Sequence, residues 1–218
     1  IGEVTGDDWG YGVTLGILAE LSDSTRLGLG YRSQIKHTLE GDFTVAGGFV
    51  DTVSADLTTP DQVTAGFYHD ISEQFAIMGE VGWTGWNSFD EIRIVGDTIG
   101  TVSVTPEDWD NSWFYGLGAT WRANEKLTLR SGIAFDQSPV PDNRRTPRIP
   151  DEDRTWVSLG LNYSLSPAIS IDAGYTHIFV SDPVVNLAAG YTTPAAPALT
   201  ATYEASVDIV ALSATFRF

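Results

Sequence analysis

The chain closes on the stretch Val207-Asp208-Ile209-Val210-Ala211-Leu212-Ser213-Ala214-Thr215-Phe216-Arg217-Phe218, in which apolar residues alternate with polar or small ones. Successive side chains of a β-strand point to opposite faces. One face is therefore apolar and consists of Val210, Leu212, Ala214, Phe216 and Phe218, whereas Ala211, Ser213, Thr215 and Arg217 lie on the other. A tilted strand of about ten residues is long enough to cross a lipid bilayer. The stretch is a candidate transmembrane strand if the rest of the chain repeats its pattern.

The same alternation recurs along the chain and predicts roughly nine strands. The clearest covers residues 113–122, where one face is apolar with an aromatic residue at each end and is formed by Trp113, Tyr115, Leu117, Ala119 and Trp121. The opposite face is mostly small or polar and holds Phe114, Gly116, Gly118, Thr120 and Arg122. A strand has this composition when lipid lies outside, aromatic residues mark both membrane surfaces and a polar lumen lies inside.

The connections between the predicted strands alternate in length. Four are short and polar, around residues 22–25, 72–74, 123–126 and 164–167. Between them lie four long ones, at roughly residues 40–61, 87–111, 137–154 and 181–204, which exceed the usual loop length. Tight turns on one side and long loops on the other are typical of outer-membrane β-barrels, in which the periplasmic turns are short and the extracellular loops long.

The alternation also sets the direction of each strand. The last strand follows a long loop and the first precedes a short turn, so both descend toward the periplasm, and Ile1 is expected on the extracellular side. Barrels of this type have an even number of strands and as a rule keep both termini in the periplasm. Strands that begin outside therefore predict an odd number of further strands upstream. Residues 1–218 are interpreted as a single, partial, all-β domain of an antiparallel transmembrane β-barrel.

Composition excludes several other classes of protein. The 218 residues include no Cys and carry a formal net charge of −17, and no stretch approaches the ~18 apolar residues of a transmembrane helix. The acidic excess argues against nucleic-acid binding, which needs clustered Lys and Arg. The three His residues fall in separate segments without metal-ligand spacing. We expect no cofactor, no metal site and no enzymatic activity. A lipase-like pair of Ser158 and His177 is disfavoured because His177 is predicted to face lipid.

The most specific string covers residues 135–156, which hold four of the ten prolines together with several Asp and Arg residues. Proline stiffens the backbone and Arg pairs with Asp, so the string predicts an ordered extracellular loop that either covers the barrel mouth or also controls ligand access. With residues 6–12 and 29–41, it resembles the FadL family of long-chain fatty acid transporters, which includes channels for aromatic hydrocarbons. The resemblance runs from the start of the chain to Phe218.

The resemblance implies a barrel of about fourteen strands whose lumen is plugged by an N-terminal hatch. It implies that a hydrophobic substrate, such as a long-chain fatty acid, is captured in an extracellular groove, enters an apolar interior pocket and leaves sideways into the membrane by passive diffusion. The present chain is then expected to be the C-terminal part, without the hatch, the early strands and the kinked strand of the lateral opening. The expected location is the outer membrane of a Gram-negative cell.

The predicted loop from Gly41 to Pro60 carries more apolar residues than a water-facing segment needs. The candidates for an outer substrate groove are Phe43, Val45, Phe49, Val50, Val53 and Leu57. Exposed apolar patches commonly mark binding sites, and the resemblance places a groove-forming loop here. The alternative is that these side chains pack against a neighbouring loop.

Cations on the predicted lumen face are a second set of candidates, namely Arg32, Lys36, Arg122, Arg130 and Arg217. They could bind a substrate carboxylate through charge-assisted hydrogen bonds. The favoured alternative is that they pair with the acids of the same face, Glu20, Asp70, Glu80, Asp136 and Asp172. Likewise, the acidic residues 151–153 are either solvated or bind divalent cations that bridge lipopolysaccharide.

Two other functional classes remain as alternatives, a general polar porin and a structural or adhesin barrel without transport. A porin is expected to carry charged constriction residues on an inward-folded loop. The segment from Gly41 to Pro60 is instead mostly apolar and small. The sequence therefore favours uptake of hydrophobic compounds.

Overall fold

The computed structural model describes residues 2–190 and 197–217, which form three antiparallel sheets and one short 3₁₀ helix, η1 (Trp86–Ser88). The largest sheet has nine strands, in the spatial order β16 (Ser206–Phe216), β13 (Ile169–Val180), β12 (Arg154–Ser166), β11 (Leu127–Asp136), β10 (Ser112–Arg122), β7 (Phe75–Thr84), β6 (Gln62–Asp70), β3 (Thr25–Arg32) and β2 (Thr14–Ser22). The prediction of about nine antiparallel strands is confirmed. Within the described ranges, no helix combines the length and the apolar character needed to cross a membrane.

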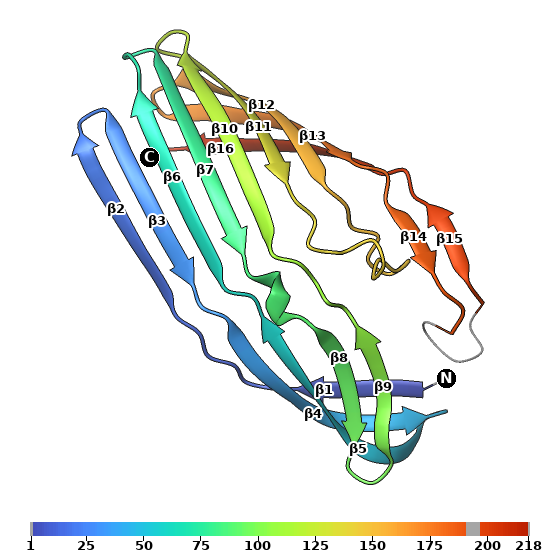
Figure 1. Cartoon of the computed structure of the whole chain (residues 1–218). Coiled ribbons are helices and arrows are strands. Elements are labelled where there is room, and N and C mark those ends of the chain that lie inside the picture. The colour runs from blue at the N-terminus through green and yellow to red at the C-terminus, as the bar shows by residue number, and fades with distance from the viewer. Residues whose placement is uncertain (1, 191–196, 218) are drawn as a thin grey trace.

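The two faces of the nine-stranded sheet differ in polarity, as the alternation predicted. In β10, Trp113 and Leu117 are exposed, whereas Phe114 on the other face is half-buried. Pairing extends this pattern across the sheet, because Trp113 lies opposite Trp83 and Leu117 opposite Ile133. The sheet curves, and β12, β13 and β16 lie behind β7 and β10 in the view of Figure 1. We call the face of Phe114 the inner face and the apolar face of Trp113 and Leu117 the outer face.

Tight turns join the strands at one end of this sheet, and the long connections lie at the other end (Figure 1). Side chains close these turns. Asn124 accepts hydrogen bonds from the backbone N–H groups of Lys126 and Leu127, and the Ser72 hydroxyl accepts one from Phe75. Asn and Ser favour turns because their short side chains reach backbone groups nearby. The segregation of short and long connections is therefore as predicted.

The long connections are not loops throughout, which corrects the prediction. Two of them, together with the N-terminal segment, build a second, five-stranded sheet whose strands in spatial order are β1 (Gly2–Asp7), β4 (Ile35–Val45), β5 (Gly48–Thr59), β8 (Glu91–Gly96) and β9 (Gly100–Pro106). A third forms the hairpin of β14 (Val184–Leu187) and β15 (Leu199–Thr202). The physical reason is that alternation continues past the nine-stranded sheet, as in the run Val53-Ser54-Ala55-Asp56-Leu57. We call the five-stranded sheet the loop sheet.

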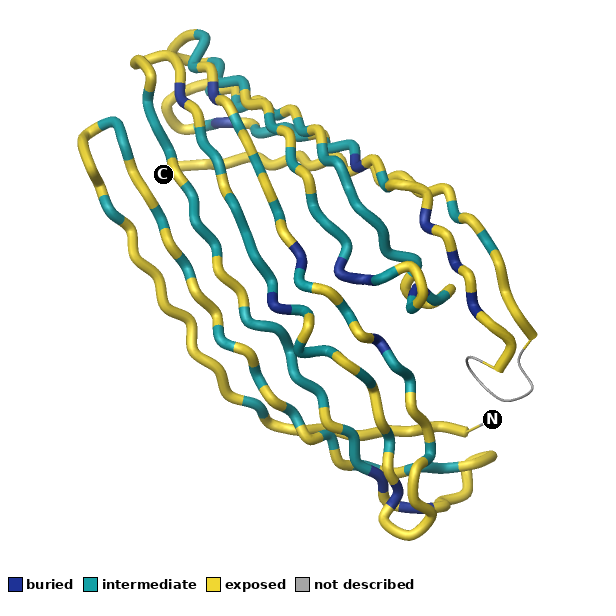
Figure 2. The backbone as a smooth tube through the Cα atoms, in the orientation of Figure 1, coloured by how far each residue is buried: buried dark blue, intermediate teal, exposed yellow. Residues whose placement is uncertain are grey.

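The nine-stranded sheet is open, with β2 and β16 at its edges. Both strands are exposed along almost their whole length (Figure 2). Within the described ranges each pairs with a single neighbour, β3 for β2 and β13 for β16. A membrane-spanning sheet must satisfy every backbone N–H and C=O group internally, so both edges require pairing in the bilayer.

Candidate functional site

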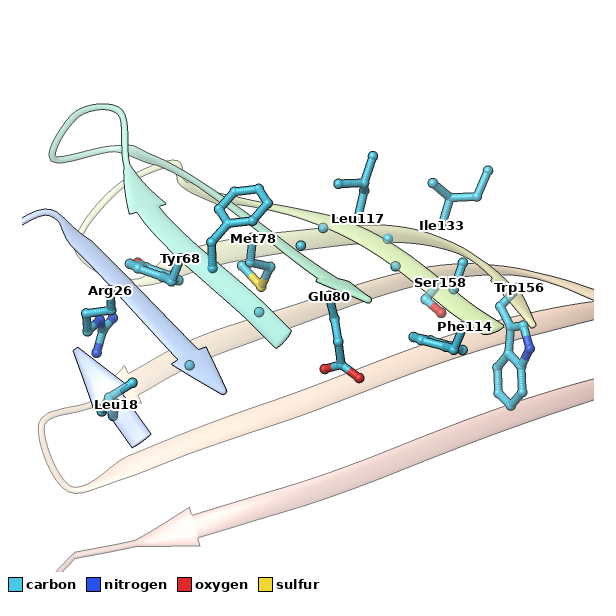
Figure 3. A pocket seen from close by; sticks show the side chains of 18 residues that line it. Leu18, Arg26, Tyr68, Met78, Glu80, Phe114, Leu117, Ile133, Trp156 and Ser158 are labelled. Carbon is cyan, nitrogen blue, oxygen red and sulfur yellow. The ribbon is translucent and has the colours of Figure 1, made fainter. Parts of the chain in front are cut away.

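A groove of about 770 Å³ lies on the inner face of the nine-stranded sheet. Its larger apolar and aromatic side chains on the inner face come from five strands and are Leu18, Tyr68, Met78, Phe114 and Trp156. Phe67, Leu117 and Ile133 also border it, with side chains that belong to the outer face. Figure 3 shows Glu80, Phe114 and Trp156 on one side of the sheet and Leu117 and Ile133 on the other. Two hollows of the same volume lie along the outer face, so the position of this groove on the inner face, and not its volume, makes it the candidate site for a small hydrophobic molecule.

Glycine makes the floor of this groove, which we call the inner groove. The glycines that line it include Gly28, Gly66, Gly116, Gly118 and Gly132. Large side chains lie over two of them: a Cβ atom at Gly118 would lie 3.0 Å from Met78 Cγ, and one at Gly116 would lie 3.2 Å from Phe114 Cε1. Sequence reasoning missed this groove. The available signal was the lone aromatic residues, such as Phe114, on a face that is otherwise small or polar.

Arg122 and Arg26 lie on the inner face toward the tight-turn end and contact other residues of the nine-stranded sheet. Arg122 Nη1 donates to Asp70 Oδ1 at 3.0 Å, and its Nη2 donates to the Tyr68 hydroxyl at 2.7 Å. The Tyr68 hydroxyl donates in turn to Asp70 Oδ1 at 2.8 Å. The guanidinium carbon of Arg26 lies 4.4 Å from the centre of the Tyr68 ring, a cation–π contact. Both guanidinium groups therefore have partners within the wall.

The other cation candidates are less tightly held. Arg130 Nη1 lies 3.9 Å from Asp172 Oδ1, the oxygen to which Asn162 also donates at 2.9 Å. Arg32, at the long-loop end of β3, makes no hydrogen bond or ion pair with any residue that the structure describes. Lys36 is likewise unpaired within residues 2–190 and 197–217, and it lies in β4. The expected lumen position of Lys36 is corrected, because β4 belongs to the loop sheet.

The loop sheet divides the six residues predicted for an outer groove. Four share one of its faces, namely Phe43, Val45, Val53 and Leu57. Val53 is buried, with 2% of its surface exposed, where β5 pairs with β8. Phe49 lies opposite Thr44 beyond a shift in register, so it belongs to the other face, and it is 65% exposed. Val50 sits at this shift. We call the face of Phe43 and Leu57 the apolar face of the loop sheet.

An aromatic cluster that sequence reasoning did not single out lies next to the loop sheet. The Trp109 ring packs edge-on against Trp86 at 5.0 Å and Phe89 at 4.9 Å between ring centres. Its indole N–H donates to Glu107 Oε2 at 3.0 Å. Burial raises the pKa of the Glu107 carboxyl above its ordinary value, against the opposing effect of this hydrogen bond. The cluster joins η1 to the segment that leads from β9 into β10.

The proline-rich segment of residues 137–153 is built around Arg145, which is 1% exposed. Its Nε donates to the Asp151 carbonyl at 2.7 Å, and its Nη1 donates to Asp142 Oδ1 at 2.8 Å and to the Val184 carbonyl at 3.0 Å. Its Nη2 lies 2.7 Å from Glu152 Oε2. Arg145 thereby fixes the shape of the segment and attaches it to β14. The prediction of an ordered loop with internal Arg–acid pairs agrees with this arrangement.

Acidic residues 151–153 form hydrogen bonds and ion pairs within that segment. Asp151 accepts a hydrogen bond from the Ser138 hydroxyl at 2.7 Å and lies 3.2 Å from Arg154 Nη1. Asp153 accepts the backbone N–H of Ser138 at 2.9 Å. The expectation of freely solvated charge is therefore corrected: these carboxylates hold the segment together.

Ser158 and His177 lie on opposite faces of the sheet. The Ser158 hydroxyl is 2.9 Å from Thr176 Oγ1 on the inner face, whereas His177 Nδ1 is 2.7 Å from Asp208 Oδ1 on the outer face. The His177 ring also packs against Phe179, 4.2 Å away between ring centres. The two residues therefore do not form a catalytic pair.

An antiparallel sheet with an apolar outer face, tight turns at one end and elaborate connections at the other is the wall of an outer-membrane β-barrel. The comparison with known protein families agrees. The family described as "Outer membrane protein transport protein (OMPP1/FadL/TodX)" matches residues 1–218, and the chain belongs to this family. The predicted family, fold and outer-membrane location are confirmed.

Relatives and solved structures show the extent of the likeness. The long-chain fatty acid transport protein of Escherichia coli O6:H1 is 33% identical over 196 residues, which cover 82% of this chain and 44% of that protein. A Pseudomonas aeruginosa FadL homologue has the same fold, with a TM-score of 0.82 at 24% identity over 94% of this chain and 52% of that one. The Pseudomonas putida toluene transporter TodX gives a TM-score of 0.60 at 15% identity, and the match covers 95% of this chain and 49% of that one. The chain spans about half the length of the curated relatives that it matches.

Proposed function

We propose that this chain is part of an outer-membrane channel that takes up long-chain fatty acids or other hydrophobic compounds by passive diffusion. The observation that carries the proposal is the inner groove, about 770 Å³ in volume and lined by aromatic and aliphatic side chains over glycine. Such a lining favours apolar molecules because it removes their surface from water. The names of the relatives, which include a long-chain fatty acid transport protein and a toluene transporter, support the same substrate class.

The proposed path begins at the loop sheet and ends in the membrane. Phe43 and Leu57 on its apolar face capture the compound outside the polar lipopolysaccharide surface, which otherwise bars hydrophobic solutes. The compound then moves to the inner groove beside Phe114 and Trp156 and leaves sideways through the wall. The remaining part of the same barrel completes the path, because the edges at β2 and β16 are open in the described residues. No covalent step is involved.

Uptake into liposomes tests the proposal on the full-length protein. We expect saturable entry of 1-dodecanol or ethylbenzene and exclusion of glucose, because the groove is apolar and Arg122 is held by Asp70 rather than lining an open pore. Free passage of glucose, with no saturable entry of either hydrophobic compound, would contradict the proposal and favour a general porin.

A matched pair of substitutions tests the capture step. Phe43→Ser is expected to weaken dodecanol binding about fivefold, because it removes an aromatic contact worth about 1 kcal/mol from the apolar face. Phe49→Ser is the control, since Phe49 lies on the opposite face of the same hairpin, and it should change the affinity by less than about twofold. Equal losses in the two variants, measured by competition binding, would remove the apolar face from the path.

A further inference from the structure

The inner groove contains one carboxylate, that of Glu80 in the middle of β7. Glu80 is exposed and points into the groove between Met78 and Phe114 (Figure 3). Within the described ranges the Glu80 carboxylate makes no hydrogen bond or ion pair. Asp70 and Asp172, which lie on the same inner face, are each paired with an arginine. The expectation that lumen acids pair with lumen cations therefore fails at this position.

The pairing register explains why Glu80 has no partner. Its direct neighbours on the inner face are Gly66 in β6 and Gly116 in β10, which have no side chains. Its other inner-face neighbours are uncharged and are Met78 and Gly82 along β7, Thr64 and Tyr68 in β6, and Phe114 and Gly118 in β10. No cation stands beside the carboxylate on its own strand or on either adjacent strand.

The nearest cations of the inner face are on the next strands out and have other partners. Arg26 of β3, which also lines the inner groove, stacks on the uncharged ring of Tyr68 toward the tight-turn end, and Arg130 of β11 lies beside Asp172. A carboxylate without a paired cation repels a second carboxylate that binds beside it. The same carboxylate does not repel an uncharged molecule of the same shape.

We propose that Glu80 narrows the proposed function to one of its two substrate classes, so that the inner groove binds uncharged hydrophobic molecules in preference to fatty acid anions. This inference rests on the proposed function, because it assumes that the groove holds the transported compound. It makes Glu80 a specificity-determining residue. The neutral amide of Gln occupies almost the same volume as the carboxylate, so Glu80→Gln should remove the repulsion and keep the shape of the groove.

The test measures the affinity of the full-length protein in detergent for 1-dodecanol and for laurate, which have the same chain length and differ in charge. Wild-type protein should prefer dodecanol. Glu80→Gln should raise the affinity for laurate about tenfold while changing that for dodecanol by less than about twofold. Glu73→Gln is the control, because Glu73 lies in the exposed turn between β6 and β7 and outside the groove lining, and it should leave both affinities unchanged.

The outcomes separate this inference from the proposed function. Binding of both compounds with the same laurate-to-dodecanol ratio in wild-type protein and Glu80→Gln would overturn the role of Glu80 alone. A parallel loss of both affinities in Glu80→Gln would also overturn it, since Glu80 would then maintain the structure rather than select the charge of the compound. Binding of neither compound by the wild-type protein would overturn the proposed function and this inference with it.

Discussion

Arg145 shows how one side chain can hold an extracellular segment in shape. A buried guanidinium is costly to remove from water unless every donor finds an acceptor, and Arg145 meets carboxylates and carbonyls on several sides. Sequence alone predicted Arg–acid pairing in this segment. It could not single out Arg145 from Arg144 and Arg148, because the choice depends on the Val184 carbonyl in a hairpin far along the chain.

Replacing Arg145 tests this account at the level of one residue. Arg145→Ala leaves Glu152 and the carbonyl groups around it without their donor, and we expect a loss of about 3 kcal/mol in the local stability of residues 138–153. Hydrogen exchange of the full-length protein should show faster exchange there and at residues 184–187. Arg148→Ala is the control because Arg148 is exposed. Indistinguishable exchange in the two variants would mean that Arg145 does not organise the segment.

Among the elements, the β8–β9 hairpin is held to the rest of the loop sheet by the pairing of β8 with β5 and by one buried carboxylate at its turn. Asp51 of β5, 5% exposed, accepts the backbone N–H groups of Thr98 and Ile99 at 2.9 and 3.0 Å. These bonds lower the pKa of the Asp51 carboxyl below its ordinary value, because they favour its charged form. A depressed pKa in the folded state means that the stabilisation is fully present above the ordinary Asp pKa. It is lost as the pH falls through the lower, folded value.

Amide exchange in the turn of this hairpin measures that contribution. Asp51→Ala should increase exchange at Thr98 and Ile99 at neutral pH, whereas Asp97→Ala, at an exposed position in the same turn, should have little effect. In the wild-type protein, protection relative to Asp51→Ala should persist down to the ordinary Asp pKa and disappear in stronger acid. Protection that is the same in wild type and Asp51→Ala across this range would show that the carboxylate does not hold the turn.

The strands of the nine-stranded sheet could be predicted because a single rule, the alternation of apolar and polar residues, applies along each of them. Period-two alternation with aromatic ends identified the strands of the nine-stranded sheet, because lipid on one side and a lumen on the other act on every residue of those strands. The hairpins of the loop sheet were predicted as loops, although residues such as Val53 and Leu57 alternate with polar neighbours. The length of a connection does not by itself distinguish a loop from a hairpin, and pairing between β5 and β8 cannot be read from either segment by itself.

At the scale of the whole molecule, the site arises from pairing between strands distant in sequence. Phe114 and Trp156 are isolated aromatic residues on faces that are otherwise mostly small or polar, and only the register of β10, β11 and β12 brings them to one groove. The direction of the strands followed from loop lengths, since tight turns and long connections must lie at opposite ends. We therefore expect a hydrophobic compound to travel along the inner face of the sheet rather than over the outer face.

Photolabelling of the full-length protein with a diazirine-bearing alkyl probe, mapped by mass spectrometry, tests that claim most directly. Label should appear on Met78, Phe114 and Trp156 of the inner groove, and excess unlabelled dodecanol should suppress it. Label on Leu117 and Ile133 of the outer face should remain, because detergent and lipid reach these residues without a specific site. Competition confined to Leu117 and Ile133, or the absence of label from the inner groove, would contradict the account.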